Sequence, residues 1–130
     1  MEMAIEDAGI STKELSYLNA HGTSTHMNDL RETEGIKKAL GKDAYNIPVS
    51  STKSMTGHML GAAGGLEAAV CVKTITDGII PPTAGYRVPD PECDLDYVTD
   101  GSRKVDVRYA MSNSFGFGGH NAALIFKRYE

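Results

Sequence analysis

The chain has 130 residues, a net charge of −4 and 41% hydrophobic residues. A chain of this length and composition folds as one domain with one core rather than remaining disordered. The negative charge argues against a nucleic acid as the main partner, and because no run of about 18 apolar residues occurs, no membrane-spanning helix is predicted.

The first predicted elements are a helix and a strand. Apolar residues at positions 1, 4, 5 and 8 have helical spacing, and Gly9 is placed to end that helix. The run LSYLNA, residues 15–20, predicts a short buried strand. A polar loop, HGTSTHMND, follows, so polar side chains are expected where this strand ends.

The middle of the chain predicts two helices with a short strand between them. A helix is expected from about residue 30 to Leu40, capped by Asn28 or Asp29 and stopped by Gly41. The segment NIPVSS predicts the second strand, and TKSMTGHM is expected to be a loop. A further helix is expected at 62–77. Its buried face is expected to carry Leu66, Ala69, Val70, Lys73 and Ile75.

The last third of the chain predicts a long connection and a hairpin. GIIPPTAGYRVPDPECDLD is expected to be irregular, although Ile79 and Ile80 make it too apolar for a flexible linker. VRYAMSNS and AALIFKRY predict two strands joined by the tight glycine turn FGFGGHN. The order of elements predicts an α/β fold, with helices layered on a mixed, mainly parallel sheet that ends in an antiparallel hairpin.

Two histidine loops follow the two predicted parallel strands. His21 follows the first strand in NAHGTST, and His58 follows the second in KSMTGH. Ligands of such sheets bind beyond the carboxyl ends of the strands, so we expect both loops to project toward the same rim. A lone histidine more often only tethers a loop, but a second one at the equivalent point favours a shared site.

Lys53 lies near His58 in the sequence and is expected to be buried near the same rim. A buried ammonium needs a partner. Glu67 in the following helix is the obvious candidate, and a carboxylate at the surface is the alternative interpretation of Glu67. A positive charge near His58 disfavours its protonation, and a neutral imidazole still donates a hydrogen bond to an oxygen that gains charge. This combination predicts a site that polarises a carbonyl or stabilises an enolate.

Other kinds of site fit the sequence less well. His21 and His26 are five residues apart in a Gly/Ser/Thr loop, and Cys71 and Cys93 are not paired in a ligand motif, so no metal site is expected. The glycines have the wrong order for a phosphate loop or a dinucleotide fingerprint. The stretch GAAGG instead predicts a helix start that packs closely against a ligand or another subunit. The two cysteines are expected to be reduced thiols of a cytoplasmic protein.

Several long motifs together resemble the β-ketoacyl-[acyl-carrier-protein] synthases of the elongating type. NAHGTST, SSTKSMTGHMLGAAGG and NSFGFGGHNAALIF look like three C-terminal signatures of that family, and PPT and CDLDYV between them also match. The resemblance covers essentially all of residues 1–130. It implies a thiolase-like fold of two similar α/β halves, usually a homodimer, in which this chain is the C-terminal portion of the second half.

The resemblance also implies which parts of the family lie outside the chain. The family's nucleophilic cysteine belongs to the first half, and neither Cys71 nor Cys93 matches its motif. The first strand of the second half is expected just before Met1. Because that strand is expected to be central, the sheet is expected to lack an interior piece. The isolated chain is therefore expected to be inactive.

The family reaction is a decarboxylative Claisen condensation. Malonyl on acyl carrier protein loses carbon dioxide, and the enolate attacks an acyl thioester held on the cysteine. By resemblance, His21 and His58 are the two active-site histidines, which donate hydrogen bonds to the malonyl thioester oxygen. Lys53 matches the family lysine that orients the site electrostatically and pairs with the position of Glu67.

Further site residues come from the same resemblance. Thr23 and Thr25 match threonines that hold the pantetheine arm. Phe117 matches a gating phenylalanine whose backbone N–H contributes to the oxyanion hole, and its alternative interpretation is a packed hairpin aromatic. His26 stands where many relatives have proline and is interpreted as loop variation, and His120 is assigned no catalytic role.

The implied partners are acyl carrier protein and its malonyl and acyl thioesters. No cofactor is expected, because the substrates arrive on the phosphopantetheine arm. Fatty acid elongation is the leading function, and the alternatives are a polyketide-synthase ketosynthase domain or a non-catalytic binding or structural fragment. Chain-length-factor-like relatives normally lose active-site residues, so the presence of His21, Lys53 and His58 argues against such a role for the parent protein.

Overall fold

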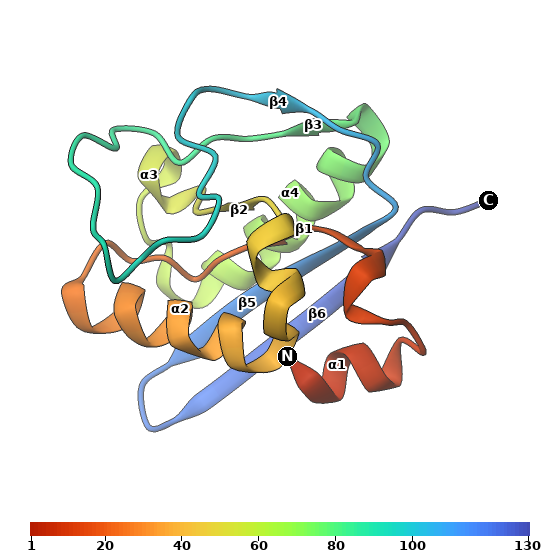
Figure 1. Cartoon of the computed structure of the whole chain (residues 1–130), viewed down its shortest axis with the longest axis horizontal. Coiled ribbons are helices and arrows are strands. Elements are labelled where there is room, and N and C mark those ends of the chain that lie inside the picture. The colour runs from red at the N-terminus through yellow and green to blue at the C-terminus, as the bar shows by residue number, and fades with distance from the viewer.

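The computed structural model describes residues 1–130, and its main element is a four-stranded sheet (Figure 1). The sheet strands are β1 (Leu15–Asn19), β2 (Val49–Ser50), β5 (Tyr109–Gly116) and β6 (His120–Lys127). The α-helices are α1 (Glu2–Asp7), α2 (His26–Leu40), α3 (Lys53–Thr56) and α4 (Ala63–Asp77). Short 3-10 turns occupy Thr12–Glu14, Gly41–Asn46 and Leu60–Ala62.

The strand order is β2-β1-β5-β6. β1 is parallel to β2 and to β5, whereas β5 and β6 form an antiparallel hairpin. The predicted α/β class with a mainly parallel sheet and a terminal hairpin is therefore confirmed. Each neighbouring pair is hydrogen-bonded, so this sheet has no interior gap, and the expectation of a missing interior strand is wrong. The free edges are β2 and β6.

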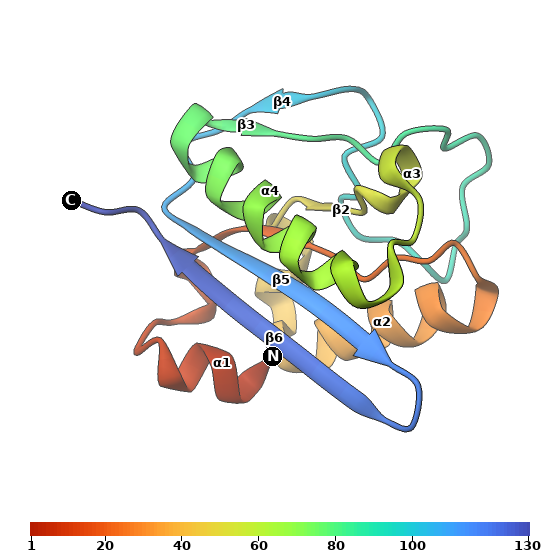
Figure 2. The ribbon, with the colours of Figure 1, turned by 180° about the vertical axis from the view of Figure 1, so that it is seen from behind.

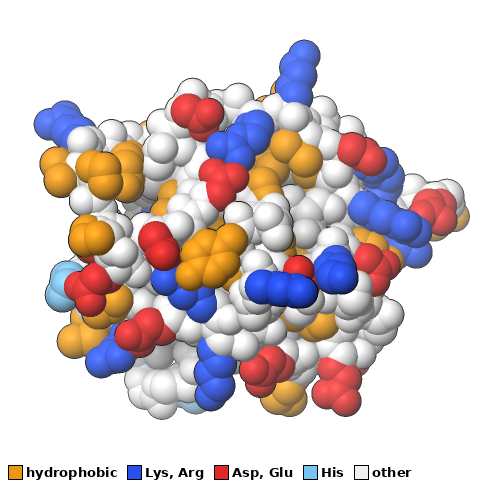
Figure 3. All heavy atoms as spheres, viewed as in Figure 1, with side chains coloured by type: hydrophobic (Ala, Val, Ile, Leu, Met, Phe, Trp, Pro, Cys, Tyr) orange, Lys and Arg blue, Asp and Glu red, His pale blue; other side chains and the backbone are white.

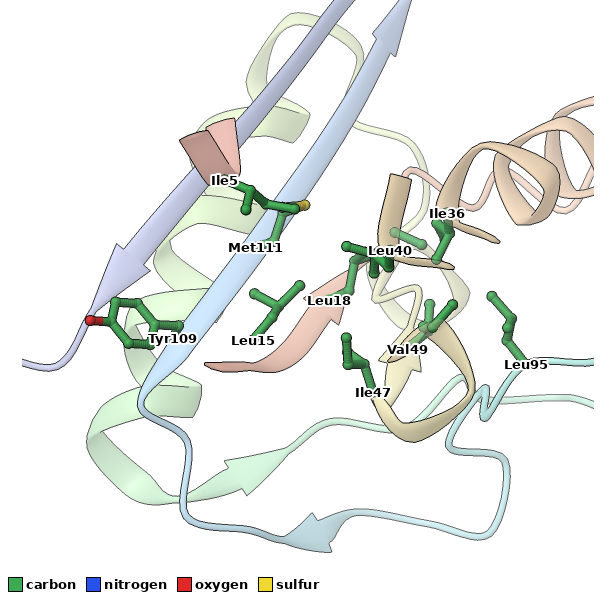
Figure 4. Packing of buried hydrophobic residues seen from close by; sticks show 12 residues of the cluster. Ile5, Leu15, Leu18, Ile36, Leu40, Ile47, Val49, Leu95, Tyr109 and Met111 are labelled. Atoms are coloured by element: carbon green, nitrogen blue, oxygen red, sulfur yellow. The ribbon is translucent and has the colours of Figure 1, made fainter. Parts of the chain in front are cut away.

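Helices cover both faces of the sheet. α1 and α2 lie on the face seen in Figure 1, and α4 lies on the opposite face, seen in Figure 2. On the first face, Ile5, Ile36 and Leu40 pack with Leu18 and Met111 of the strands (Figure 4). The second cluster, under α4, consists of Tyr17, Cys71, Ile75, Ile80, Val98, Val107 and Ala110.

Three local predictions are corrected by the structure. α2 begins at His26 with Thr25 as its N-cap, rather than near residue 30, and the Asp29 carboxylate accepts the Ser24 N–H at 3.2 Å from within the first turn. The expected loop after β2 contains the one-turn helix α3. The long connection contains β3 (Ile79–Ile80), which pairs antiparallel with β4 (Arg103–Lys104).

The buried face of α4 also differs from the prediction. Lys73 and Ala69 are exposed, Leu66 and Val70 are half-buried, and only Ile75 of the expected set is buried. The face that packs on the sheet is Ala63, Glu67, Cys71, Thr74 and Ile75. The buried charged residue Glu67 and the buried polar residue Thr74 are the reason that a pattern based on apolar residues alone did not identify this face.

The surface does not suggest a strongly charged partner on the face drawn in Figure 3, because acidic and basic side chains are intermingled there. None of the helices is long and apolar enough to span a bilayer; the longest, α2 and α4, have 15 residues each. What the fold does supply is a common rim. The ends of β1 and β2, the start of α2, α3 and the β5–β6 turn all lie at the left in Figure 1.

Candidate functional site

His21 lies two residues after the end of β1, and a buried carboxylate holds its backbone. Glu32 of α2 accepts the backbone N–H of His21 at 2.9 Å and that of Gly22 at 2.8 Å. Asn113 of β5 also donates to Glu32, at 3.4 Å. Burial raises the pKa of Glu32, and these hydrogen bonds oppose that rise. The loop that carries His21 is thus tied to both α2 and the sheet.

Lys53 forms a buried ion pair with Glu67, as predicted, and both side chains are almost completely inaccessible. The Lys53 ammonium also lies 3.4 Å from Nδ1 of His21. The sequence placed this charge beside His58, whereas the observed contact is with His21, because the Lys53 side chain points toward α4 and β1. An ammonium has only donors, so Nδ1 of His21 acts as the acceptor.

The imidazole of His58 is oriented by its own turn. Its Nδ1 accepts the Leu60 backbone N–H at 3.1 Å, and Leu60 adopts φ +51°, a conformation that is uncommon for a residue with a side chain. The His21 and His58 rings meet edge to face, with centroids 5.4 Å apart. Because Nδ1 is an acceptor in both rings, the neutral form of each carries its proton on Nε2. The geometry therefore leaves the Nε2 atoms of two separate loops as the donor positions of the site.

Burial is the main reason that the pKa of His21 falls to about 4, and the positive charge of Lys53 and the neighbouring His58 lower it further. His21 is consequently a neutral imidazole at physiological pH. A neutral donor held next to a fixed ammonium can stabilise an oxygen that becomes negative, without first losing or gaining a proton.

An open cavity of about 910 Å³ lies beside the two imidazoles. Thr23 and Thr25 have hydroxyls 3.0 Å apart. Both residues line this cavity and also a second one of about 450 Å³. Phe117 lies at the cavity mouth with 98% of its surface exposed, which excludes the packed-aromatic interpretation in this structure. His120 also lines the cavity, whereas His26 faces the second one.

Neither cysteine belongs to the imidazole cluster. Cys71 is fully buried under the sheet, donates to the Met111 carbonyl, and has its pKa raised to about 12 by burial. Cys93 is half-buried and lines the second cavity, and burial raises its pKa as well. A thiol is a poor nucleophile under such conditions, so these cysteines supply no activated thiolate here.

Three buried side-chain oxygens have no hydrogen-bond partner: Asn19 Oδ1, Glu67 Oε2 and Asn113 Oδ1. Each belongs to a residue next to the imidazole cluster or to its supporting contacts.

Across residues 1–130, no three side chains of the His, Cys, Asp or Glu type come together as metal ligands.

Two supporting residues were missed by the sequence analysis. Glu32 lies one and two turns before Ile36 and Leu40 on the buried face of α2, so a carboxylate at an apolar position was the available signal. Phe115 lies 5.4 Å from His21, ring to ring, and no local pattern distinguishes it from Phe117. The structure brings His21, Lys53, Glu67 and His58 together, and leaves Phe117 exposed at the edge of the group.

Residues 1–87 match the family model described as the C-terminal domain of beta-ketoacyl synthase. The chain is 58% identical to the 3-oxoacyl-[acyl-carrier-protein] synthase 2 of Synechocystis sp., over 98% of this chain and 30% of that protein. It is 55% identical to the protein of the same name from Staphylococcus aureus, over 100% of this chain and 31% of that one. The chain thus spans about a third of the length of these curated relatives.

Solved structures give the same picture. A chain in the complex of a type II polyketide-synthase acyl-carrier protein with its ketosynthase superposes with a TM-score of 0.96 at 39% identity, covering 99% of this chain and 32% of that one. A beta-ketoacyl synthase from Burkholderia phymatum superposes with a TM-score of 0.93 at 40% identity, covering 100% of this chain and 31% of that one.

Proposed function

Since the chain belongs to the β-ketoacyl synthase family, we propose that it is the C-terminal part of a 3-oxoacyl-[acyl-carrier-protein] synthase. The parent enzyme would elongate fatty acids by decarboxylative condensation. The observation that carries this proposal is the pair of imidazoles from separate loops, with ring centroids 5.4 Å apart and a lysine ammonium 3.4 Å from Nδ1 of His21. Such an arrangement suits a carbonyl oxygen that takes up negative charge.

In the proposed reaction, the bond between the malonyl α-carbon and its carboxylate breaks, and carbon dioxide leaves. The electron pair moves into the thioester, where the Nε2 protons of His21 and His58 stabilise the enolate oxygen. The α-carbon then attacks the carbonyl carbon of the acyl thioester, and the cysteine thiolate departs. Lys53 keeps Nδ1 of His21 unprotonated, so that the Nε2 proton is always presented. The cysteine would come from a part of the enzyme other than Cys71 and Cys93.

The remaining residues have binding roles in this proposal. Thr23 and Thr25 would hold the pantetheine arm, because their hydroxyls line the cavity beside the imidazoles. Phe117 would gate the site from the glycine turn between β5 and β6, and its backbone N–H would contribute to the oxyanion hole. The partner would be acyl carrier protein with its malonyl and acyl thioesters. We further propose that the parent works as a homodimer in the cytoplasm, without a bound cofactor.

A polyketide ketosynthase is the second candidate, because one superposed structure pairs a ketosynthase with its polyketide-synthase carrier protein. The relatives named for 3-oxoacyl-[acyl-carrier-protein] synthase are 55–58% identical, whereas the matched chain of the polyketide-synthase complex is 39% identical. This difference favours fatty acid elongation.

The test is the release of labelled carbon dioxide from malonyl-acyl carrier protein in the presence of an acyl donor. We expect a longer protein containing residues 1–130 and the family's cysteine half to release it with formation of the 3-oxoacyl product. The isolated 130-residue chain should show only the background rate. Robust condensation by the isolated chain, or none by the longer protein with a correctly folded site, would contradict the proposal.

A further inference from the structure

A buried polar network lies beneath the imidazole site, in a cluster that is otherwise apolar. Tyr17 of β1 is fully buried, and its ring packs with Ile75, Ile80 and Val107 under α4. Its hydroxyl nevertheless lies 2.8 Å from Oγ of Ser50 and accepts a hydrogen bond from the Asn19 amide at 3.0 Å. Burying a hydroxyl is costly unless it is hydrogen-bonded, so the position would be occupied more simply by phenylalanine if it served packing alone.

The amide of Asn19 links this hydroxyl to the active-site turn. One proton of Nδ2 goes to the Tyr17 hydroxyl, and the other goes to Oγ1 of Thr52 at 3.3 Å. Both donors of the amide nitrogen are therefore used. Thr52 is the N-cap of α3 and directly precedes Lys53. The network thus joins β1, β2 and the residue before the lysine that contacts His21.

We propose that Tyr17 is a positioning residue for this site: its hydroxyl, through Asn19 and Thr52, holds the start of α3 so that the Lys53 ammonium stays against Nδ1 of His21. This inference rests on the proposed function only for its kinetic consequence. Its structural consequence, a displaced lysine charge, can be measured without any turnover.

The charges around His21 determine whether its pKa should rise or fall when the lysine is displaced. Lys53 of α3 and His58 in the turn after α3 disfavour protonation, whereas Asp29 of α2 favours it. Glu32 of α2 faces the backbone of the same residue, and Glu67 of α4 is held by the lysine. If Lys53 moves away, the repulsion of an imidazolium weakens, and the pKa of His21 should rise from about 4 toward its usual value near 6.5.

The experiment uses Tyr17→Phe in the longer condensing enzyme, with the protonation midpoint of His21 measured by hydrogen–deuterium exchange at the imidazole C2 position and mass spectrometry. Tyr109→Phe is the matched control, because Tyr109 is also buried but its hydroxyl makes no hydrogen bond and points away from its cluster (Figure 4). We expect a higher His21 midpoint in Tyr17→Phe and an unchanged midpoint in Tyr109→Phe. Thr52→Val removes the acceptor of the Asn19 amide while keeping the shape of the side chain, and it should also raise the His21 midpoint.

Turnover supplies the second readout. Displacement of the lysine by part of an ångström should lower kcat by about tenfold, less than the ~100-fold loss that a 1 Å misplacement can cause, with KM for malonyl-carrier protein unchanged. An unchanged His21 midpoint in both Tyr17→Phe and Thr52→Val would overturn the inference, as would the same shift in Tyr109→Phe. A shifted midpoint in a protein that never condenses malonyl groups would support the network and contradict the proposed function instead.

Discussion

The imidazole site has two halves that are built differently. His21, Lys53 and Glu67 are buried and are held by an ion pair, a carboxylate and backbone hydrogen bonds. The turn between β5 and β6 is open, with Phe117 at 98% exposure and two adjacent glycines at φ +81° and +83°. Contacts with buried residues thus hold the charged groups in place, whereas the proposed gate Phe117 is almost free of contacts. Substitutions in the first half should affect stability, and those in the second should affect turnover alone.

The largest effect is expected from Lys53→Ala. This substitution leaves Glu67 as a buried carboxylate with no cationic partner, and breaking a buried pair costs about 3–5 kcal/mol. The free energy of unfolding, measured with denaturant, should fall by that amount. Lys73→Ala is the control, because its pair with Asp77 on the same helix α4 is exposed. That pair should contribute less than about 0.5 kcal/mol, and equal losses in the two variants would contradict the proposed contrast.

His58→Ala tests a residue between the two halves. Because its side chain is exposed, the substitution should change the free energy of unfolding only slightly. In the longer enzyme the variant would lack one of the two proposed enolate donors, and loss of such a donor costs about 2.7–4 kcal/mol of transition-state stabilisation, or about 10²–10³ in kcat. Steady-state decarboxylation of malonyl-carrier protein measures this loss. A rate near that of the wild type would remove His58 from the mechanism.

Gly22→Ala should disturb the first half through the backbone. Gly22 adopts φ +41°, and an added Cβ would come within 2.4 Å of Cβ of Ser51, whose hydroxyl donates to the Gly22 carbonyl. Overpacking of this kind costs about 1–3 kcal/mol. Gly65→Ala in α4 is the control, since nothing lies within 4 Å of its added Cβ. The control should be neutral or stabilising by up to about 1 kcal/mol, as judged by thermal unfolding.

Much of the secondary structure was predictable from the sequence, because it depends on local patterns. The strand at 15–20, the helix at 62–77, the hairpin and the convergence of two histidine loops follow from periodicity, turn residues and the geometry of parallel strands. The Lys53–Glu67 pair was also predictable, since a buried ammonium requires a carboxylate and Glu67 lies on the next helix.

The remaining features depend on long-range contacts. The Glu32 carboxylate of α2 accepts the N–H groups of His21 and Gly22; its place on the apolar face marks it as a buried carboxylate, but nothing in the sequence indicates these partners. α2 starts at His26 rather than near residue 30, because neither candidate cap, Asn28 or Asp29, lies at the N-cap; Asp29 binds the Ser24 N–H from inside the helix. The contact of Lys53 with His21 rather than His58 reflects side-chain direction, which sequence distance does not encode.

The smallest effect on stability is expected from Phe117→Ala, and it gives the clearest test of the comparison. An exposed side chain that buries almost nothing should change the free energy of unfolding by no more than about 0.5 kcal/mol. Phe115→Ala, two residues earlier, removes a half-buried ring that lies 5.4 Å from that of His21, so it should destabilise the protein more. If Phe117 is the gate, its variant should nevertheless slow condensation in the longer enzyme while leaving the His21 midpoint untouched. Because Phe117 contacts none of the buried charged groups, a loss of turnover without a loss of stability or a change in that midpoint would separate gating from placement of charge. If Phe117→Ala lost as much stability as Phe115→Ala, the β5–β6 turn would be packed in the working enzyme. The contrast between this turn and the buried group of His21, Lys53 and Glu67 would then be wrong.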